Sequence, residues 1–384
     1  MDFRDTSQDA EFREHARSVL ESAVAALPGP EPTTLEDKLP YFRQFQEAIH
    51  AAGFAGLSWP REYGGRSASL TDQAIFLEEY DRAGAPDRLN TLGEGLAGPT
   101  IIDFGTEGQK QRFLPPILTG EEIWCQLFSE PGAGSDLAAL EARAERDGDG
   151  WRITGQKVWT SRAQIASYGI LLARTDGPRH RGITYFLLPM DSPGVTIRPL
   201  RHMLGEAEFN EVFLDEVPVP DDLRVGEVDG GWKVAMATLS YERVALATGR
   251  VNIRRLMQRM IEMVATTEHN GTPIGSDPML RRRIAELYAR AQIQRVNGLR
   301  ALASLEKGTP GPETSIGKLF SAPLVEELAD LACSISGLDA QLLGDGELDP
   351  WLRLAYQARG TSIAGGTTFI QRNIVAERVL SLPR

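Results

Sequence analysis

The chain has 384 residues, enough to bury a large core and to form two or three domains. Its formal net charge of −12 argues against nonspecific nucleic-acid binding, which needs a basic surface, but it leaves room for an anionic substrate. No apolar run is long enough to span a membrane, and the charged first residues lack the apolar stretch of a secretory signal. We therefore expect a cytoplasmic protein.

Cysteine and histidine usage excludes two further classes of site. The two cysteines, Cys125 and Cys333, lie far apart in the sequence, so no disulfide framework is indicated. The five histidines are scattered and show no metal-ligand spacing. We predict no metal site.

Residues 1–120 are predicted to form a helical domain. Apolar residues recur at helical spacing over 11–26, 70–83 and 109–118. A proline-rich break at 28–32 ends the first of these segments.

The pattern changes over residues 121–228, where short runs of β-forming residues alternate with turns. These runs cover 151–154, 168–172, 183–188, 195–197 and 211–214. The sequence Asp-Gly-Asp-Gly at 147–150 is typical of a hairpin turn. Strands of this length and spacing predict a small β-barrel or sandwich.

Helical periodicity returns over residues 229–384. Four long apolar stripes, at 234–265, 279–305, 314–336 and 352–380, predict a four-helix bundle. The predicted fold is therefore mainly α with a central β domain, and its three domains are residues 1–120, 121–228 and 229–384.

Two segments about twenty residues apart carry the strongest functional signal. Residues 128–136 read FSEPGAGSD, and residues 155–161 read GQKVWTS. Glycines in the first segment let backbone N–H groups approach a ligand closely. The second places a large aromatic residue directly before two hydroxyl residues at the end of a predicted strand. Together, the segments are suited to a large, flat, phosphorylated cofactor.

This pair of segments resembles the acyl-CoA dehydrogenase family, and the resemblance extends over nearly the whole chain. It continues through residues 53–65, 105–110, 226–233 and 371–378, in the family's order. The resemblance implies FAD as cofactor, an acyl-CoA substrate and an electron-transfer flavoprotein as electron acceptor. It also implies a dimer or tetramer, made of identical or different subunits.

The same resemblance implies roles for individual residues. Those that would line the flavin ring, face the cofactor phosphates or pantetheine, or lie near the cofactor are Gln126, Phe128, Ser129, Gly134, Ser135, Trp159, Thr160, Ser161 and Thr367. Trp159 would pack against the flavin, with Thr160 and Ser161 at the edge of its ring. The alternative for Trp159 is a core aromatic residue within a sheet.

The family places its catalytic carboxylate at one of two positions. At the commoner one this chain has Gly365, which cannot act as a base. At the other, early in the first C-terminal helix, it has Glu242. We therefore expect Glu242 to remove the α proton of the thioester while the flavin accepts the β hydride. The alternative is an exposed helical glutamate next to Arg243.

Some segments depart from the family pattern. Residues 269–278 and 336–341 match poorly where many members contact a neighbouring subunit's FAD, and Phe369 stands at a position that is usually polar. These departures leave two alternatives open: a subunit of a heteromeric dehydrogenase with reduced activity of its own, or a homodimer that holds FAD by other contacts. A separate alternative, from a different reaction class, is a flavin monooxygenase or oxidase on the same scaffold.

The substrate class follows from the two glycines at 365 and 366. They remove bulk from one wall of the expected pocket, so we predict a branched, long or polycyclic acyl group over a short straight one. This places the protein in fatty acid or steroid side-chain metabolism.

Overall fold

The computed structural model describes residues 5–32, 35–247, 253–306, 313–344 and 347–383. Within these ranges the side chains of 35–36, 242–247, 302–306, 313–314, 343–344 and 347 lie outside the description. The chain divides into two compact units, residues 1–242 and 243–384.

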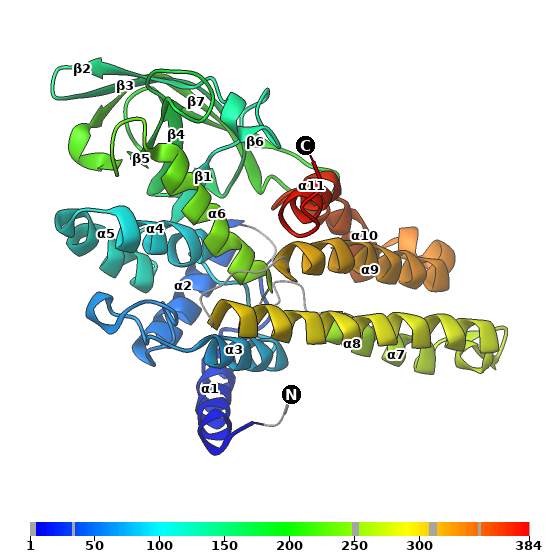
Figure 1. Ribbon diagram of the computed structural model, residues 1–384. Helices are drawn as coiled ribbons and strands as arrows, with labels where there is room; N and C mark the ends of the chain where they lie inside the picture. The colour runs from blue at the N-terminus through cyan, green and yellow to red at the C-terminus, as the bar shows by residue number, and fades with distance from the viewer. Residues whose placement is uncertain (1–4, 33–34, 248–252, 307–312, 345–346, 384) are drawn as a thin grey trace. The chain divides into compact units, whose positions relative to one another are not determined.

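The first unit contains helices and a sheet domain (Figure 1). Its helices are α1 (Ser7–Ala25), α2 (Leu35–Ala51), α3 (Leu70–Arg82), α4 (Gly98–Phe104), α5 (Glu107–Thr119) and the first part of α6 (Gly231–Ala247). Its strands are β1 (Trp124–Leu127), β2 (Arg143–Asp147), β3 (Gly150–Ser161), β4 (Tyr168–Arg174), β5 (Ile183–Pro189), β6 (Val195–Leu200), β7 (Phe209–Pro220) and β8 (Arg224–Val225).

The eight strands form one sheet in the order β6-β7-β3-β2-β4-β5-β8, and β1 pairs with β4. Most pairs are antiparallel, whereas β1 runs parallel to β4. The hairpin between β2 and β3 turns at residues 147–150, as its sequence predicts, and Gly148 adopts a left-handed φ of 58° there.

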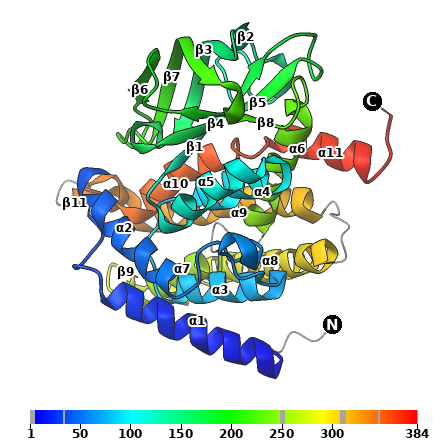
Figure 2. The same cartoon turned by 90° about the vertical axis from the view of Figure 1, so that its left-hand side faces the viewer.

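Both faces of the central strands are buried, which explains their nearly continuous apolar sequences. Along β4 and β5 alternate side chains enter two different cores. Ile170, Leu172 and Tyr185 face a core shared with η2 (Gly93–Ala97), α4, α5 and the start of α6, whereas Leu171 and Phe186 face a core within the sheet domain. Figure 2 shows α4 and α5 beneath the sheet. The helices and the sheet are therefore joined by one continuous apolar layer.

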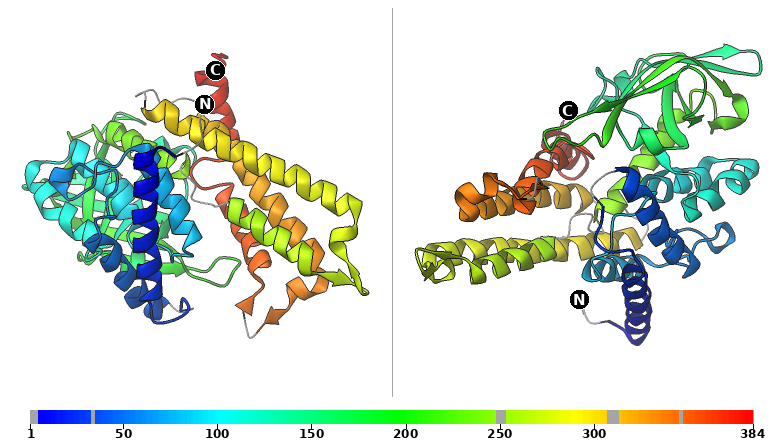
Figure 3. Two further views of the ribbon diagram at one scale, coloured as in Figure 1. Left: turned by 90° about the horizontal axis from the view of Figure 1, so that it is seen from below. Right: turned by 180° about the vertical axis from the view of Figure 1, so that it is seen from behind.

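The second unit is helical apart from two short hairpins. Its helices are α7 (Ile253–Thr266), α8 (Pro278–Glu306), α9 (Glu313–Ser336), α10 (Pro350–Thr361) and α11 (Thr368–Arg378), and its short strands are β9 (Glu268–His269), β10 (Thr272–Pro273), β11 (Leu343–Gly344) and β12 (Glu347–Leu348). Figure 3 shows α8 and α9 side by side. Apolar side chains of α7, α8, α9 and α10 form one core.

The predicted fold class is confirmed: the structure has N-terminal helices, a central sheet domain and C-terminal helices. One predicted helix is wrong. The segment 352–380 forms two helices, α10 and α11, because Gly365 and Gly366 adopt left-handed φ angles of 65° and 94° between them. The segment 234–265 is described as α6 and α7, with residues 248–252 outside the description.

The apolar periodicity of the sequence also failed to predict α2, a helix that contains Pro40. The division into three domains at residues 120 and 228 stays a prediction. No helix within the described ranges is both long and apolar enough to cross a membrane.

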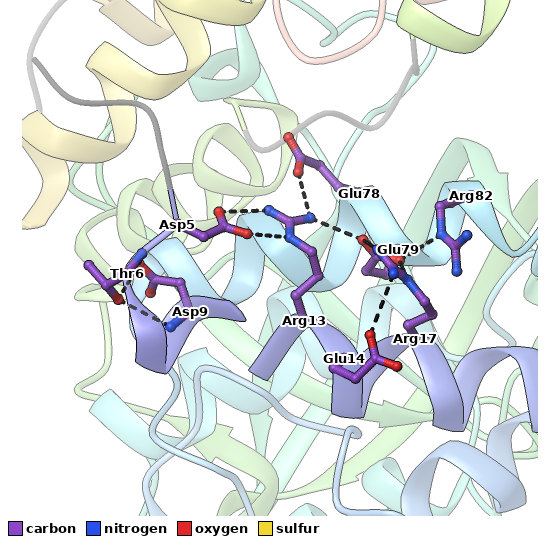
Figure 4. Close-up of polar contacts among 9 residues, drawn as sticks. All are labelled: Asp5, Thr6, Asp9, Arg13, Glu14, Arg17, Glu78, Glu79 and Arg82. Carbon is purple, nitrogen blue, oxygen red and sulfur yellow. Dashed lines mark hydrogen bonds and ion pairs between the residues drawn. The ribbon is translucent and has the colours of Figure 1, made fainter. Parts of the chain in front are cut away.

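A buried carboxylate joins α1 to α3. Glu79 is 3% exposed, and its oxygens accept hydrogen bonds from Arg13, Arg17 and Arg82 at 2.8–3.2 Å (Figure 4). Burial alone would raise the pKa of Glu79, but hydrogen bonds from the three arginines outweigh it and lower the pKa to about 2. Glu79 is therefore ionised in the native state and holds the two helices together.

We expect Glu79→Gln to lower the free energy of unfolding by about 3 kcal/mol, because it leaves three arginines around a neutral group. The pKa of Glu79 falls on folding from 4.5 to about 2. Its stabilisation is therefore complete above about pH 4.5 and declines as the pH falls toward 2. Chemical denaturation at several pH values tests both statements.

The matched control is Glu14→Gln. Glu14 also contacts Arg17, but its side chain is 75% exposed, so its loss should cost less than about 1 kcal/mol. Equal losses in the two variants would contradict the assigned role of Glu79.

Candidate active site

The fold brings the two cofactor-like segments together. The backbone N–H of Val158 in β3 donates to the carbonyl of Ser129 at 2.9 Å. Residues Glu130 and Ala133 exchange two backbone hydrogen bonds of 3.0 Å, which close the turn that follows. The loop at 128–136 is therefore a defined turn fastened to the strand that carries Trp159.

A buried ion pair lies beneath this junction. The side chain of Lys157 is 0% exposed, and its Nζ donates to Glu130 Oε1 at 2.7 Å and to the carbonyl of Phe128 at 3.3 Å. The Glu130 carboxylate also accepts from the backbone N–H groups of Glu141 and Ala142, at 2.6 and 3.0 Å. Burial lowers the pKa of the Lys157 ammonium, and the Glu130 carboxylate opposes that shift.

Trp159 lies at a bulge in β3. The pairing of β3 with β7 shifts register between Lys157 and Thr160, and Trp159 adopts a left-handed φ of 60° there. Its side chain is 61% exposed and contacts the Phe209 ring edge-on, with centroids 5.9 Å apart. A bulky residue in this conformation is strained, so local folding does not explain a tryptophan here. The exposed ring also contradicts the alternative of a core aromatic.

The two hydroxyl residues follow at the end of β3. Thr160 is fully buried beside Asn210 of β7, whose amide donates to the Thr160 carbonyl at 3.0 Å. Within the described residues, Thr160 Oγ1 and Asn210 Oδ1 have no hydrogen-bond partner. Buried polar atoms normally have one, so this pair is suited to a polar ligand or water. Ser161 is half-buried and pairs with Phe209.

The remaining predicted residues of the first unit lie around the same loop. Gln126 is half-buried in β1, and Phe128 is buried with its ring edge-on to Tyr185 at 6.0 Å. Gly134 and Ser135 are exposed, and a Cβ atom built at Gly134 would meet no heavy atom within 4 Å. A ligand can therefore come close to the backbone at Gly134.

Helix α6 carries Glu242. The backbone at Glu242 is helical, while its side chain lies outside the described part of the structure. One turn earlier, Thr238 Oγ1 lies 2.8 Å from Thr100 Oγ1 and 3.3 Å from the Tyr185 hydroxyl, and the three side chains are fully buried. Tyr241 donates to the Asp103 carboxylate. These contacts fix α6 to α4 up to the residue before Glu242.

Thr367 belongs to the second unit. Its hydroxyl accepts from the backbone N–H of Ile370 at 3.4 Å and so caps α11. The preceding turn is held by Lys318, which donates to the carbonyls of Thr361 and Ala364 at 2.6 and 2.7 Å. Gln371 donates to the Gly365 carbonyl at 3.0 Å. The cap gives Thr367 a structural role, and its place near a cofactor stays a prediction.

Sequence reasoning quoted Glu130 and Lys157 within the two motifs but assigned them no role, and it did not consider Asn210. A lysine at an inward-facing position of a strand is the signal that would have revealed the ion pair, because a buried charge needs a partner.

The residues present fit a flat, polar cofactor. They offer an exposed indole, buried polar atoms without a partner, and a turn whose glycine is open to approach. Residues that would hold the cofactor are therefore Trp159, Thr160 and the backbone of 128–135.

Comparison with known proteins decides the family. Models of the acyl-CoA dehydrogenase N-terminal, middle and C-terminal domains match residues 6–121, 125–217 and 229–380. The chain belongs to the acyl-CoA dehydrogenase family. It is 43% identical to the acyl-CoA dehydrogenase IpdE1 of Mycobacterium tuberculosis, over 97% of this chain and 98% of that protein.

Two solved structures are similar over the full length of both chains. The ChsE4-ChsE5 complex from Mycobacterium tuberculosis matches with a TM-score of 0.87 and 32% identity. The Tcur3481-Tcur3483 steroid ACAD matches with a TM-score of 0.86 and 28% identity. The protein is therefore an acyl-CoA dehydrogenase, an oxidoreductase of a flavoprotein family.

We expect Trp159→Gly to change the free energy of unfolding of the cofactor-free protein by less than about 1 kcal/mol, because the ring is exposed and glycine suits a left-handed backbone. Trp124, which is 1% exposed, provides the contrast: Trp124→Ala should cost about 3–5 kcal/mol. Thermal unfolding of both variants is the measurement. A comparable loss in Trp159→Gly would assign its ring to the core.

Proposed function

We propose that this protein uses FAD to convert an acyl-CoA thioester to its trans-2-enoyl-CoA, with Glu242 as the base. The observation that carries the proposal is the bulge in β3, which exposes Trp159 directly before the unpaired Thr160 hydroxyl. A cytoplasmic location and an electron-transfer flavoprotein as acceptor complete the proposal.

The chemistry divides between cofactor and protein. When bound, FAD supplies the acceptor for the hydride that leaves the β carbon. The Glu242 carboxylate takes the proton from the α carbon, so the two removals create the carbon–carbon double bond. Backbone N–H groups of the loop at 128–135 would hold the cofactor in place.

Two observations support Glu242 as the base. It is the one acidic residue in α6, and Gly365 at the family's other position has no carboxylate. In addition, contacts of Thr238 and Tyr241 fix the turn of α6 that precedes Glu242. The helix backbone is therefore held in place as far as Tyr241, the residue directly before Glu242. A base needs such positioning because proton transfer depends on geometry.

We expect Glu242→Gln to abolish turnover while the protein still binds FAD, because the change removes the base and keeps the side chain's shape. Anaerobic mixing with substrate, followed by the visible flavin band, measures the step directly: the wild type should bleach and the variant should stay yellow. Glu262→Gln, at an exposed position on α7, is the matched control and should bleach like the wild type. Bleaching of the flavin in Glu242→Gln would show that another residue is the base.

The substrate we propose is a branched, long or polycyclic acyl-CoA, with a steroid side chain as the preferred example. Gly365 and Gly366 support it because they carry no side chain, and one solved relative is described as a steroid ACAD.

A panel of acyl-CoA thioesters tests this preference. We expect thioesters of bulky acids to bleach the flavin of the protein expressed alone, and butyryl-CoA to do so at least about tenfold more slowly, a difference of about 1.4 kcal/mol in activation free energy. Faster bleaching by butyryl-CoA would contradict the proposed substrate class.

The same experiment also tests whether the protein needs a second subunit and whether its reduced flavin reacts with oxygen. Both solved relatives named above are complexes of two differently named proteins, which favours a heteromer over a homomer for this chain. A protein that is colourless alone but yellow when produced with a second subunit would support the heteromer. Rapid reoxidation of the bleached protein by oxygen would favour the oxidase or monooxygenase alternative.

A further inference from the structure

The Lys157–Glu130 pair joins three separate stretches of backbone. Lys157 lies in β3, two residues before Trp159, and its ammonium reaches the carbonyl of Phe128. Glu130 lies in the loop and receives the N–H groups of Glu141 and Ala142. The loop, the strand and the segment leading into β2 therefore meet at one buried carboxylate.

Close packing at this junction leaves little freedom. A Cβ atom built at Gly155 would lie 2.5 Å from Ala142 Cβ, so the segment at 141–142 lies directly against β3. The ion pair is 0% and 6% exposed at its two side chains, where solvent cannot replace a lost contact. Removing either charge must therefore move the backbone or leave a charge unpaired.

We propose that Lys157 and Glu130 are a positioning pair that sets how the loop at 128–135 lies against β3, and thereby sets the affinity for FAD. The inference rests on the proposed function. Neither side chain needs to touch the cofactor: Lys157 acts through the Phe128 carbonyl, and the Glu130 carboxylate acts through the backbone N–H groups of Glu141 and Ala142.

If the ion pair served stability alone, FAD affinity would follow thermal stability across the variants. Buried ion pairs add little net stability over an apolar pair of similar size, whereas removing one partner is strongly destabilising. The double variant Lys157→Met/Glu130→Met should therefore recover part of the thermal stability that Lys157→Met alone loses. It cannot restore the hydrogen bonds to Phe128, Glu141 and Ala142, so the loop should remain displaced.

The experiment compares full-length wild type, Glu130→Gln, Lys157→Met and the double variant, each stripped of cofactor and titrated with FAD. We expect the dissociation constant for FAD to rise about 10- to 100-fold in the double variant, because the loop at 128–135 lacks charge-assisted hydrogen bonds that hold it in the binding arrangement. The unfolding temperature of the double variant without FAD should lie above that of Lys157→Met and below that of the wild type, because three backbone groups lose their partners. Exchange of backbone amide hydrogens over residues 128–142, also measured without FAD, should be faster in the double variant than in the wild type.

Glu79→Gln is the matched control, because Glu79 is also a buried, ion-paired carboxylate of the first unit. It should lower the unfolding temperature and leave FAD affinity unchanged. If the double variant does not fold, the nearly isosteric Glu130→Gln decides, with weaker FAD binding and a shifted flavin spectrum as the expected result.

Variants that bind FAD as tightly as the wild type, with the same flavin spectrum, would overturn the inference and leave the proposed function intact. A wild type that binds no FAD would overturn the proposed function, and this inference with it.

Discussion

One buried ion pair organises the part of the molecule on which the proposed chemistry depends. Lys157 and Glu130 satisfy each other and three backbone groups inside the sheet domain. A charge in such surroundings is tolerated only when all its hydrogen bonds are made, so the pair permits few alternative loop arrangements. The ion pair holds the local fold together, so the exposed Trp159 beside it is not needed for stability and is available to bind a ligand.

Much of the architecture was predictable because burial leaves a periodic trace in the sequence. The strands β4 and β5 were recognised as apolar runs, since both of their faces are covered. The break between α10 and α11 was missed because the apolar stripe continues through Gly365 and Gly366, and glycine does not always end a helix. Similarly, Pro40 lies inside α2, where a proline normally argues against a helix.

The candidate site was only partly predictable. Local motifs located Trp159, Thr160 and the loop at 128–136, because glycine and aromatic residues in fixed order have few structural uses. Asn210 lies 50 residues from Thr160 in the sequence, and the contact between Glu141 and Glu130 arises from loop closure, so no local pattern predicts either contact. The assignment of Glu242 as the base rests on family resemblance and stays a prediction, since a single helical glutamate carries no signal of its own.

The exposure of Trp159 also provides an optical probe. Of the six tryptophans, Trp59, Trp124, Trp151 and Trp351 are buried and Trp232 is partly covered, whereas Trp159 is 61% exposed. Water around an excited indole shifts its emission to longer wavelength, so the red edge of the protein's fluorescence should arise mainly from this one residue. Changes at the bulge in β3 can therefore be followed by light, without a label, in the intact chain.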